Sequence, residues 1–284
     1  HPAAVLSGSF DADGSGVVTV CADGSAYLFT SIRGSNPTRI TSEAGPIRCA
    51  AFDPTGAMVA CAGAADSIGV WGARSGEHLR DLPFVHAPNY AGGVSALVFA
   101  PEGAELAAAC EDAKVRFWDP RTGDDTRKGL VVFPARSIAY SADGSKLLVT
   151  GRFGGGAAKV FLLGENRPPV QAEIAHAWSS SILGGVLSAD GSLVLTFASD
   201  GSAHVWEAGS GRPVAHRAGG DAAILDAAFD GGRENPRVIV ARDDGTVSVW
   251  PVDPLPAARA RTPRPLFPSE RERERRLALP LRYE

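Results

Sequence analysis

Short segments that end in an aromatic residue recur along this chain at nearly constant spacing. Successive aromatic residues are 42, 47, 43, 45 and 44 positions apart. They are Phe29, Trp71, Trp118, Phe161, Trp206 and Trp250. A repeat of this length cannot bury its own apolar face and is stabilised by stacking on its neighbours. The spacing therefore predicts six copies of one structural unit.

Each unit carries the signals of three strands joined by two hairpins. Apolar segments such as Val94–Phe99 and Leu193–Phe197 flank turns rich in Asp, Ser, Pro and Gly. A second turn carries Asp-Gly at Asp23, Asp200 and Asp244, which between β-branched runs is a strong hairpin signal. No unit shows the 3.6-residue apolar period of a helix. The fold class predicted is all-β, a β-propeller of four-stranded blades.

The pattern resembles the WD40 repeat over residues 1–250. In that family a His, a Ser or Thr, an Asp and the Trp of one repeat form a buried, hydrogen-bonded set. The fifth unit has all four at the family's spacing: His176, Thr196, Asp200 and Trp206. Other units depart from the pattern. Units three and six keep the His, as His86 and His216, but have Ala108 and Val240 in place of the hydroxyl residue. Units two and four have Ala65 and Gly155 in place of the Asp.

His, Asp and Thr together also suggest catalysis. A catalytic triad needs an exposed nucleophile beside the His. Thr196 lies in the middle of a strand, and parts of the set recur in other units, which a single active site would not do. We therefore interpret the four residues as a structural set that fixes the blade, and we expect no catalytic residue.

The resemblance also implies that the outermost strand of each blade comes from the preceding repeat. The candidate outer strands are His78–Leu82, Gly129–Phe133, Val170–Ile174 and Pro213–His216. The first unit has no such strand before it. We therefore expect an incomplete first blade in a propeller truncated from a larger one. A six-bladed ring that closes imperfectly is the alternative.

Composition limits the other classes of function. The net charge of −4 gives no nucleic-acid signature, and no apolar run approaches 18 residues, so we expect no membrane partner. The four cysteines, Cys21, Cys49, Cys61 and Cys110, lie in apolar segments without CxxC spacing. They predict core thiols in a reducing, cytoplasmic compartment, and no metal or other cofactor.

Residues 251–284 form a separate tail rich in Pro and Arg. Six prolines precede a capping-box sequence at Ser269, and Glu270–Leu279 reads as one short helix that ends before Pro280. The helix is either solvated or a docking arm. The tail also resembles the ends of many bacterial WD40 proteins, a number of which carry an N-terminal Ser/Thr protein kinase.

Three loops stand out as candidate partner-binding segments, because Tyr, Trp and Arg are enriched at interface hot spots. They are His86–Gly93 with Asn89 and Tyr90, Gly151–Gly156 with Arg152 and Phe153, and Ala175–Ser181 with Trp178.

The sequence as a whole predicts a non-enzymatic scaffold for a protein or peptide partner, in the form of a regulatory or sensing propeller of a larger bacterial signalling protein. Two alternatives remain. A metal-dependent propeller hydrolase needs acidic residues or His where the innermost strands begin, and those strands begin with mostly apolar residues. Nucleic-acid binding would use the eight Arg of the tail.

Overall fold

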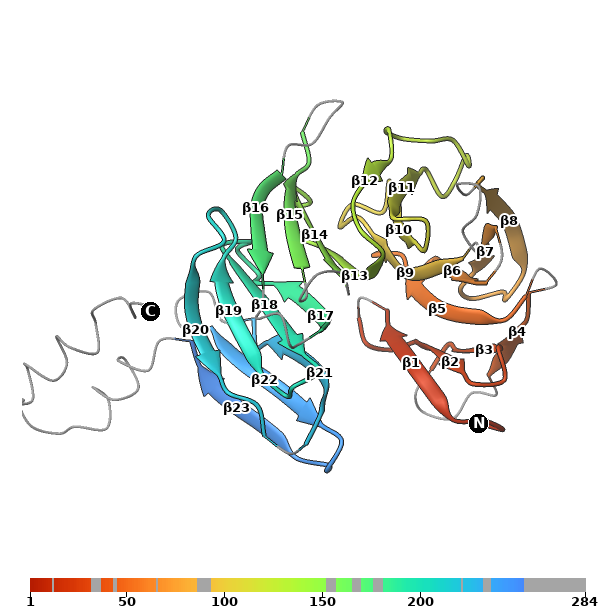
Figure 1. Ribbon diagram of the computed structural model, residues 1–284. Helices are drawn as coiled ribbons and strands as arrows, with labels where there is room; N and C mark the ends of the chain where they lie inside the picture. Colours follow the sequence, from red (N-terminus) through yellow and green to blue (C-terminus); the bar gives the residue numbers. More distant parts are fainter. Residues whose placement is uncertain are drawn as a thin grey trace, which may run out of the picture.

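The computed structural model describes residues 1–11, 13–31, 37–42, 45–64, 66–85, 93–151, 157–164, 170–175, 181–220, 222–231 and 236–252. These residues form six antiparallel β-sheets that follow one another around a ring (Figure 1). The first five sheets have four strands each and the sixth has three. The predicted all-β propeller with six repeats is confirmed.

Within every sheet the strands lie side by side in sequence order. Sheet one contains β1 (Val5–Phe10), β2 (Val17–Cys21), β3 (Ala26–Phe29) and β4 (Thr38–Ile40). Sheet two contains β5 (Ile47–Phe52), β6 (Met58–Gly63), β7 (Ser67–Gly72) and β8 (His78–Pro83). Sheet three contains β9 (Val94–Phe99), β10 (Leu106–Cys110), β11 (Lys114–Trp118) and β12 (Leu130–Val131).

The second half of the chain continues the series. Sheet four contains β13 (Ala135–Tyr140), β14 (Lys146–Gly151), β15 (Ala157–Leu162) and β16 (Val170–Ala175). Sheet five contains β17 (Ile182–Leu187), β18 (Leu193–Ala198), β19 (Ala203–Glu207) and β20 (Pro213–Arg217). Sheet six contains β21 (Ile224–Phe229), β22 (Arg237–Arg242) and β23 (Val247–Pro251).

The core lies between the sheets. The first strand of each sheet contacts the first strand of the next, from β1 through β5, β9, β13 and β17 to β21. Alternate side chains of the second and third strands fill the space between neighbouring sheets, because successive side chains of a strand point to opposite faces. Leu195 and Val205 of sheet five, for example, are fully buried in one cluster with Val238, Val240 and Trp250 of sheet six.

The turns follow the expected chemistry. Gly24, in the Asp-Gly hairpin of sheet one, has φ of 80°, a region that residues with a side chain rarely adopt. Its backbone also approaches the next sheet, since a Cβ there would lie 2.7 Å from Pro46 Cβ. The carbonyl of Gly24 accepts a hydrogen bond of 2.9 Å from the amide of Ile47, the first residue of β5. This hairpin therefore links sheet one to sheet two.

The outer strands belong to other sheets than the sequence suggested. His78–Pro83 pairs with β7, whose last residues it follows, and the same holds for β12, β16 and β20. A short turn around Gly76 makes β8 the antiparallel neighbour of β7, whereas the following connection leads to the next sheet. The prediction of an incomplete first blade is therefore wrong: β4 completes sheet one, and sheet six is the one with three strands among the described residues.

Two further predictions concern the end of the chain and the membrane. The expected helix Glu270–Leu279 and nearly all of the tail lie outside the described residues. Within the described ranges, no helix has the length and apolar character needed to span a membrane.

Candidate functional site

One face of the ring carries the connections that lead from each outer strand to the next innermost strand, together with the hairpins between second and third strands. We call it the connection face. Aspartate side chains build its hairpins, as each carboxylate accepts a hydrogen bond from a backbone amide two residues on. The distances are 3.0 Å for Asp23 to Ser25, 2.9 Å for Asp200 to Ser202 and 2.9 Å for Asp244 to Thr246. Such Asx turns fix the hairpin geometry.

The structural set predicted in sheet five is partly described. The indole Nε1 of Trp206 donates a hydrogen bond of 2.8 Å to Thr196 Oγ1, and Thr196 is fully buried. Asp200 closes the hairpin of the same sheet through Ser202. His176, the fourth member, lies outside the described residues. The arrangement of Thr196 fits a structural role, because a buried hydroxyl that accepts a hydrogen bond from an indole is not exposed to a substrate.

His204 is a member of this cluster that the sequence did not single out. Its ring stacks on Trp206 at a centroid distance of 5.6 Å and lies 3.1 Å from Ser202 Oγ through Nε2. Burial lowers the pKa of His204 below its ordinary value, and the neighbouring His216 lowers it further. The neutral imidazole is therefore favoured. The signal in the sequence is its position, four residues after the hairpin aspartate.

The same position in sheet three is occupied by Arg116, which the sequence also did not single out. Its Nη1 and Nη2 donate to the two carboxylate oxygens of Asp112 at 2.8 and 2.7 Å, and the Asp112 side chain is fully buried. Nη2 also donates to the carbonyl of Val85 at 2.8 Å, and the guanidinium lies 5.1 Å from the centroid of Phe84. In this sheet an ion pair fixes the hairpin aspartate.

Sheet six lacks these partners. Val240 stands where Thr196 stands in sheet five, and Trp250 Nε1 is buried without a hydrogen-bond acceptor in the described structure. Ser248 follows Asp244 at the same four-residue distance, and its hydroxyl is likewise buried and unpaired there. The decay of the repeat pattern at Val240 therefore leaves the indole Nε1 of Trp250 unsatisfied, and Ser248 Oγ is a second unsatisfied atom in this sheet.

The innermost strands share a second feature on the connection face. In all six, the pairing register shifts at the second residue, so that one residue bulges out of the ladder. The bulged residues are Leu6, Arg48, Ser95, Arg136, Leu183 and Leu225. A β-bulge re-aims its side chain relative to the regular strand pattern. Four of the six side chains, Leu6, Arg48, Arg136 and Leu225, are exposed. Ser95 instead donates hydrogen bonds to the carbonyls of Ala109 and Ala135, and Leu183 packs against the core between sheets five and six.

Further charged groups lie beside these bulged residues. Arg48 Nη1 lies 3.0 Å from Glu111 Oε1 of sheet three, an exposed ion pair between neighbouring sheets. At the junction of sheets five and six, a shallow hollow of about 650 Å³ is lined in part by Arg217, Arg242, Asp243 and Asp244. The connection face thus presents both charge signs, and the described residues include no cluster of three or more metal-binding side chains.

The partner-binding residues predicted from the sequence, Asn89, Tyr90, Arg152, Phe153 and Trp178, all lie outside the described residues, so their prediction stands untested. The predicted core thiols are confirmed for Cys21, Cys61 and Cys110, which are buried, whereas Cys49 is partly buried.

Comparisons with known proteins agree with this geometry. Residues 84–119, which run through the three inner strands of sheet three, match the family WD40, described as WD domain, G-beta repeat. No curated protein matches the chain. Among solved structures, the chain is similar to the β-propeller domain of Cps50 (Swd1) from Myceliophteria thermophila, with a TM-score of 0.74 and 16% identity over 87% of this chain and 83% of that one.

Fold and comparisons together define the class: the protein has the β-propeller fold, and one of its repeats, at residues 84–119, matches the WD40 repeat. Propellers of this class typically serve as scaffolds for protein interaction. The low identity to the solved propeller means that this likeness extends to the fold alone.

Proposed function

We propose that this propeller is a non-catalytic scaffold that binds a protein or peptide partner on its connection face. The observation that carries the proposal is the ring of bulged residues. The strands beneath them repeat the same buried pattern from sheet to sheet, but the bulged side chains differ in charge and polarity. The exposed positions among them, Leu6, Arg48, Arg136 and Leu225, can vary without disturbing the packed core and can therefore specify a partner.

The chemistry of the ring favours a partner that carries both apolar and acidic side chains. Leu6 and Leu225 are exposed on neighbouring parts of the ring, and Arg48 and Arg136 are exposed on sheets two and four. Exposed leucines offer apolar contacts, and guanidinium groups pair with carboxylates. The charged positions contribute chiefly to the rate and selectivity of association.

The proposal is tested by capturing partners with the purified propeller and measuring the affinity of each by calorimetry. The combined charge reversal Arg48→Glu and Arg136→Glu is expected to weaken binding at least tenfold. Arg121→Glu is the matched control, since Arg121 is exposed on the opposite face, in the turn between β11 and β12. A partner that binds the double variant normally and is lost with Arg121→Glu places the binding surface on the opposite face and contradicts the proposal.

The setting of this scaffold is a regulatory or sensing part of a larger bacterial signalling protein in the cytoplasm. Two observations support it: the sequence of the tail resembles the ends of bacterial WD40 proteins, and the thiols lie in the core, as suits a reducing compartment. The complete open reading frame tests it. A signalling domain encoded in the same frame supports this setting, and a frame that encodes a secretion signal contradicts it.

A further inference from the structure

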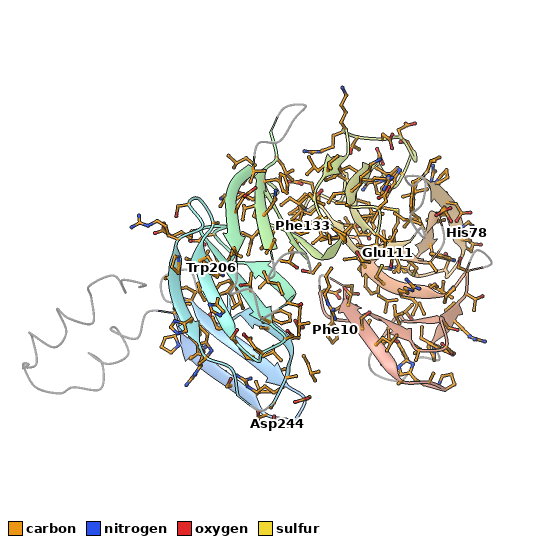
Figure 2. The ribbon with its side chains drawn as sticks, viewed as in Figure 1. Phe10, His78, Glu111, Phe133, Trp206 and Asp244 are labelled. Carbon is orange, nitrogen blue, oxygen red and sulfur yellow. The ribbon has the colours of Figure 1, made fainter. Side chains whose placement is uncertain are left out.

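The hairpin turn between β1 and β2 differs from its counterparts in the other sheets. Figure 2 labels Phe10, the last residue of β1, directly before this turn. The turn has the sequence Asp-Ala-Asp-Gly-Ser-Gly at positions 11–16. The backbone amide of Asp11 donates to the carbonyl of Gly16 at 3.1 Å, and a hydrogen bond of the same kind closes the equivalent turn of every other sheet. The first and last residues of the six turns therefore correspond.

One carboxylate oxygen of Asp11 is left without a partner in this turn. Asp11 Oδ2 accepts hydrogen bonds from the Gly16 amide at 2.9 Å and from Ser15 Oγ at 3.1 Å. Asp11 Oδ1 is buried and has no hydrogen-bond partner in the described structure. Burying a charged oxygen without a donor or a cation is costly, so such an atom indicates a missing partner.

The acidic residues that begin two other turns show how the same position is normally satisfied. Asp53 of sheet two accepts from the Met58 amide with Oδ1 at 2.7 Å and from Thr55 Oγ1 with Oδ2 at 2.5 Å. Asp230 of sheet six accepts from the amide of Arg237 with Oδ1 and from its Nε with Oδ2. Both carboxylates therefore use both oxygens, whereas Asp11 uses one.

Sheet five shows what the turn of sheet one has exchanged. There the first residue is Ser188, whose hydroxyl donates to Asp190 at 2.6 Å, and sheet four has the same arrangement. Asp13 corresponds to Asp190, and its Oδ1 accepts from the amide two residues on in the same way. The first residue is now Asp11, which has no proton to donate. Sheet one thus places two carboxylates where sheet five places a hydroxyl and a carboxylate, and neighbouring like charges favour a cation between them.

Gly16 makes room for the Asp11 carboxylate. A Cβ at Gly16 would lie 2.7 Å from Asp11 Oδ2, closer than the two atoms could approach. The last residues of the other five turns all carry side chains: Met58, Glu105, Lys146, Leu193 and Arg237. The position that Asp11 occupies therefore depends on the glycine.

The turn borders a hollow that further hydroxyl groups line. The hollow has a volume of about 490 Å³ and lies between sheets one and two, on the face opposite the connection face. Thr30 and Thr55 line it together with Asp11, Asp13 and Ser15. Oxygen atoms of carboxylates, hydroxyls, carbonyls and water are the ligands that calcium takes in proteins.

We propose that this turn binds a calcium ion, with Asp11 Oδ1, the Asp13 carboxylate and Ser15 Oγ as its side-chain ligands. In the calcium loops of EF-hand proteins, acidic or amide residues at positions one, three and five supply ligands, and glycine stands at position six. Asp11, Asp13, Ser15 and Gly16 have this spacing, with Ser at position five. The cysteine spacing, from which we predicted no metal, does not bear on this site, because its donors are oxygen atoms.

Two features limit the affinity of the site. The EF-hand loop has a bidentate Glu at position twelve, where this chain has Ala22, because the turn joins two strands rather than two helices. Arg74 is exposed and lines the same hollow, so its guanidinium competes with the ion for the carboxylates. We therefore expect a dissociation constant of about 10⁻⁴ M, at the weak end of the range for such loops.

Titration calorimetry of the calcium-free protein with CaCl₂ tests the proposal. We expect one ion to bind per chain and the thermal unfolding midpoint to rise with calcium. The same concentration of MgCl₂ should raise it less, because Mg²⁺ demands a near-ideal octahedral shell. The proposal is overturned if no saturable heat appears at calcium concentrations of about 100 times the expected dissociation constant. An equal rise of the midpoint with MgCl₂ also overturns it.

Asp11→Ser separates the loss of a ligand from the loss of the fold. It gives the turn the Ser-Ala-Asp-Gly-Ser sequence of sheets four and five, which closes through its own hydrogen bonds. We expect calcium binding at least tenfold weaker, with an unfolding midpoint in EDTA no lower than that of the original protein. The matched control is Asp190→Asn, in the equivalent turn of sheet five, which should leave the affinity unchanged. Calcium binding by Asp11→Ser with the original affinity contradicts the proposal.

Arg74→Gln gives the opposite expectation. Removal of the competing guanidinium should tighten calcium binding severalfold, a gain that a damaged fold cannot produce. If Arg74→Gln binds calcium more weakly than the original protein, the ion does not lie beside Asp11 and Asp13, and the assignment of its ligands is wrong.

Discussion

Trp206 and Thr196 are joined by a buried hydrogen bond of 2.8 Å, and the equivalent pair in the next sheet, Trp250 and Val240, has none. The two indoles occupy the same place in their sheets and differ in whether an acceptor is present. This difference gives two matched predictions.

Thr196→Val is expected to destabilise the protein by about 1–3 kcal/mol, because it leaves the buried indole Nε1 of Trp206 without an acceptor. Val and Thr have nearly the same shape, so packing changes little. The free energy of unfolding from urea denaturation measures the effect. The control is Val194→Thr. Val194 is fully buried on the same strand, and this substitution places a hydroxyl in an apolar cluster. A Thr196→Val variant as stable as the original protein contradicts the role assigned to this bond.

Val240→Thr is expected to stabilise the protein by about 1 kcal/mol, because its hydroxyl supplies the acceptor that Trp250 Nε1 lacks. Val238→Thr, the neighbouring buried position of β22 that faces the same way, should destabilise it instead. The thermal unfolding midpoints of the two variants, each compared with that of the original protein, test this prediction. If both variants melt below the original protein, Val240 does not correspond to Thr196 in three dimensions.

The repeats, the strands and most of the core could be predicted from the sequence, because each strand carries a local period-two pattern and each turn carries Asp, Pro or Gly. The sheet to which an outer strand belongs could not. That assignment depends on whether a connection turns back, as around Gly76, or crosses to the next sheet, and both kinds of connection have similar composition. Arg116 was missed because its partner Asp112 is brought to it only by the hairpin. His204 was missed because its partner His216 is brought to it only by the pairing of β19 with β20.

The ion pair between Arg116 and Asp112 is expected to contribute more to the free energy of unfolding than an exposed ion pair does. Arg116→Ala leaves the fully buried carboxylate of Asp112 without its cation and should cost about 3–5 kcal/mol. Arg48→Ala, which breaks the exposed pair with Glu111, should cost at most about 1 kcal/mol. Chemical denaturation of the two variants measures both. Equal effects would show that Asp112 is solvated when Arg116 is removed.

Asp190 gives the protein a predicted dependence on acidic pH. Hydrogen bonds from Ser188 and Ser192 lower the pKa of Asp190 from 3.8 to about 2. The unfolded state therefore binds the proton more tightly, so the stabilisation is complete above about pH 4 and is lost as the pH falls toward 2. Asp190→Asn should lower the unfolding midpoint at pH 7, and the difference from the original protein should shrink below pH 4. A difference that stays constant between pH 7 and pH 3 contradicts this account.

The thiols of the core are expected to resist modification as long as the sheets stay packed. Burial raises the pKa of Cys49 to about 12 and that of Cys110 to about 11, so the reactive thiolate is scarce at neutral pH. Maleimide at pH 7.5 should leave the native protein unmodified by mass spectrometry and add four labels after denaturation. Val131→Cys, at a 79% exposed position of β12, should take one label in the native state and serves as the control. Rapid native labelling of Cys49, which lies between sheets two and three, would show that these sheets separate in solution, because only separation gives the reagent access to its sulfur.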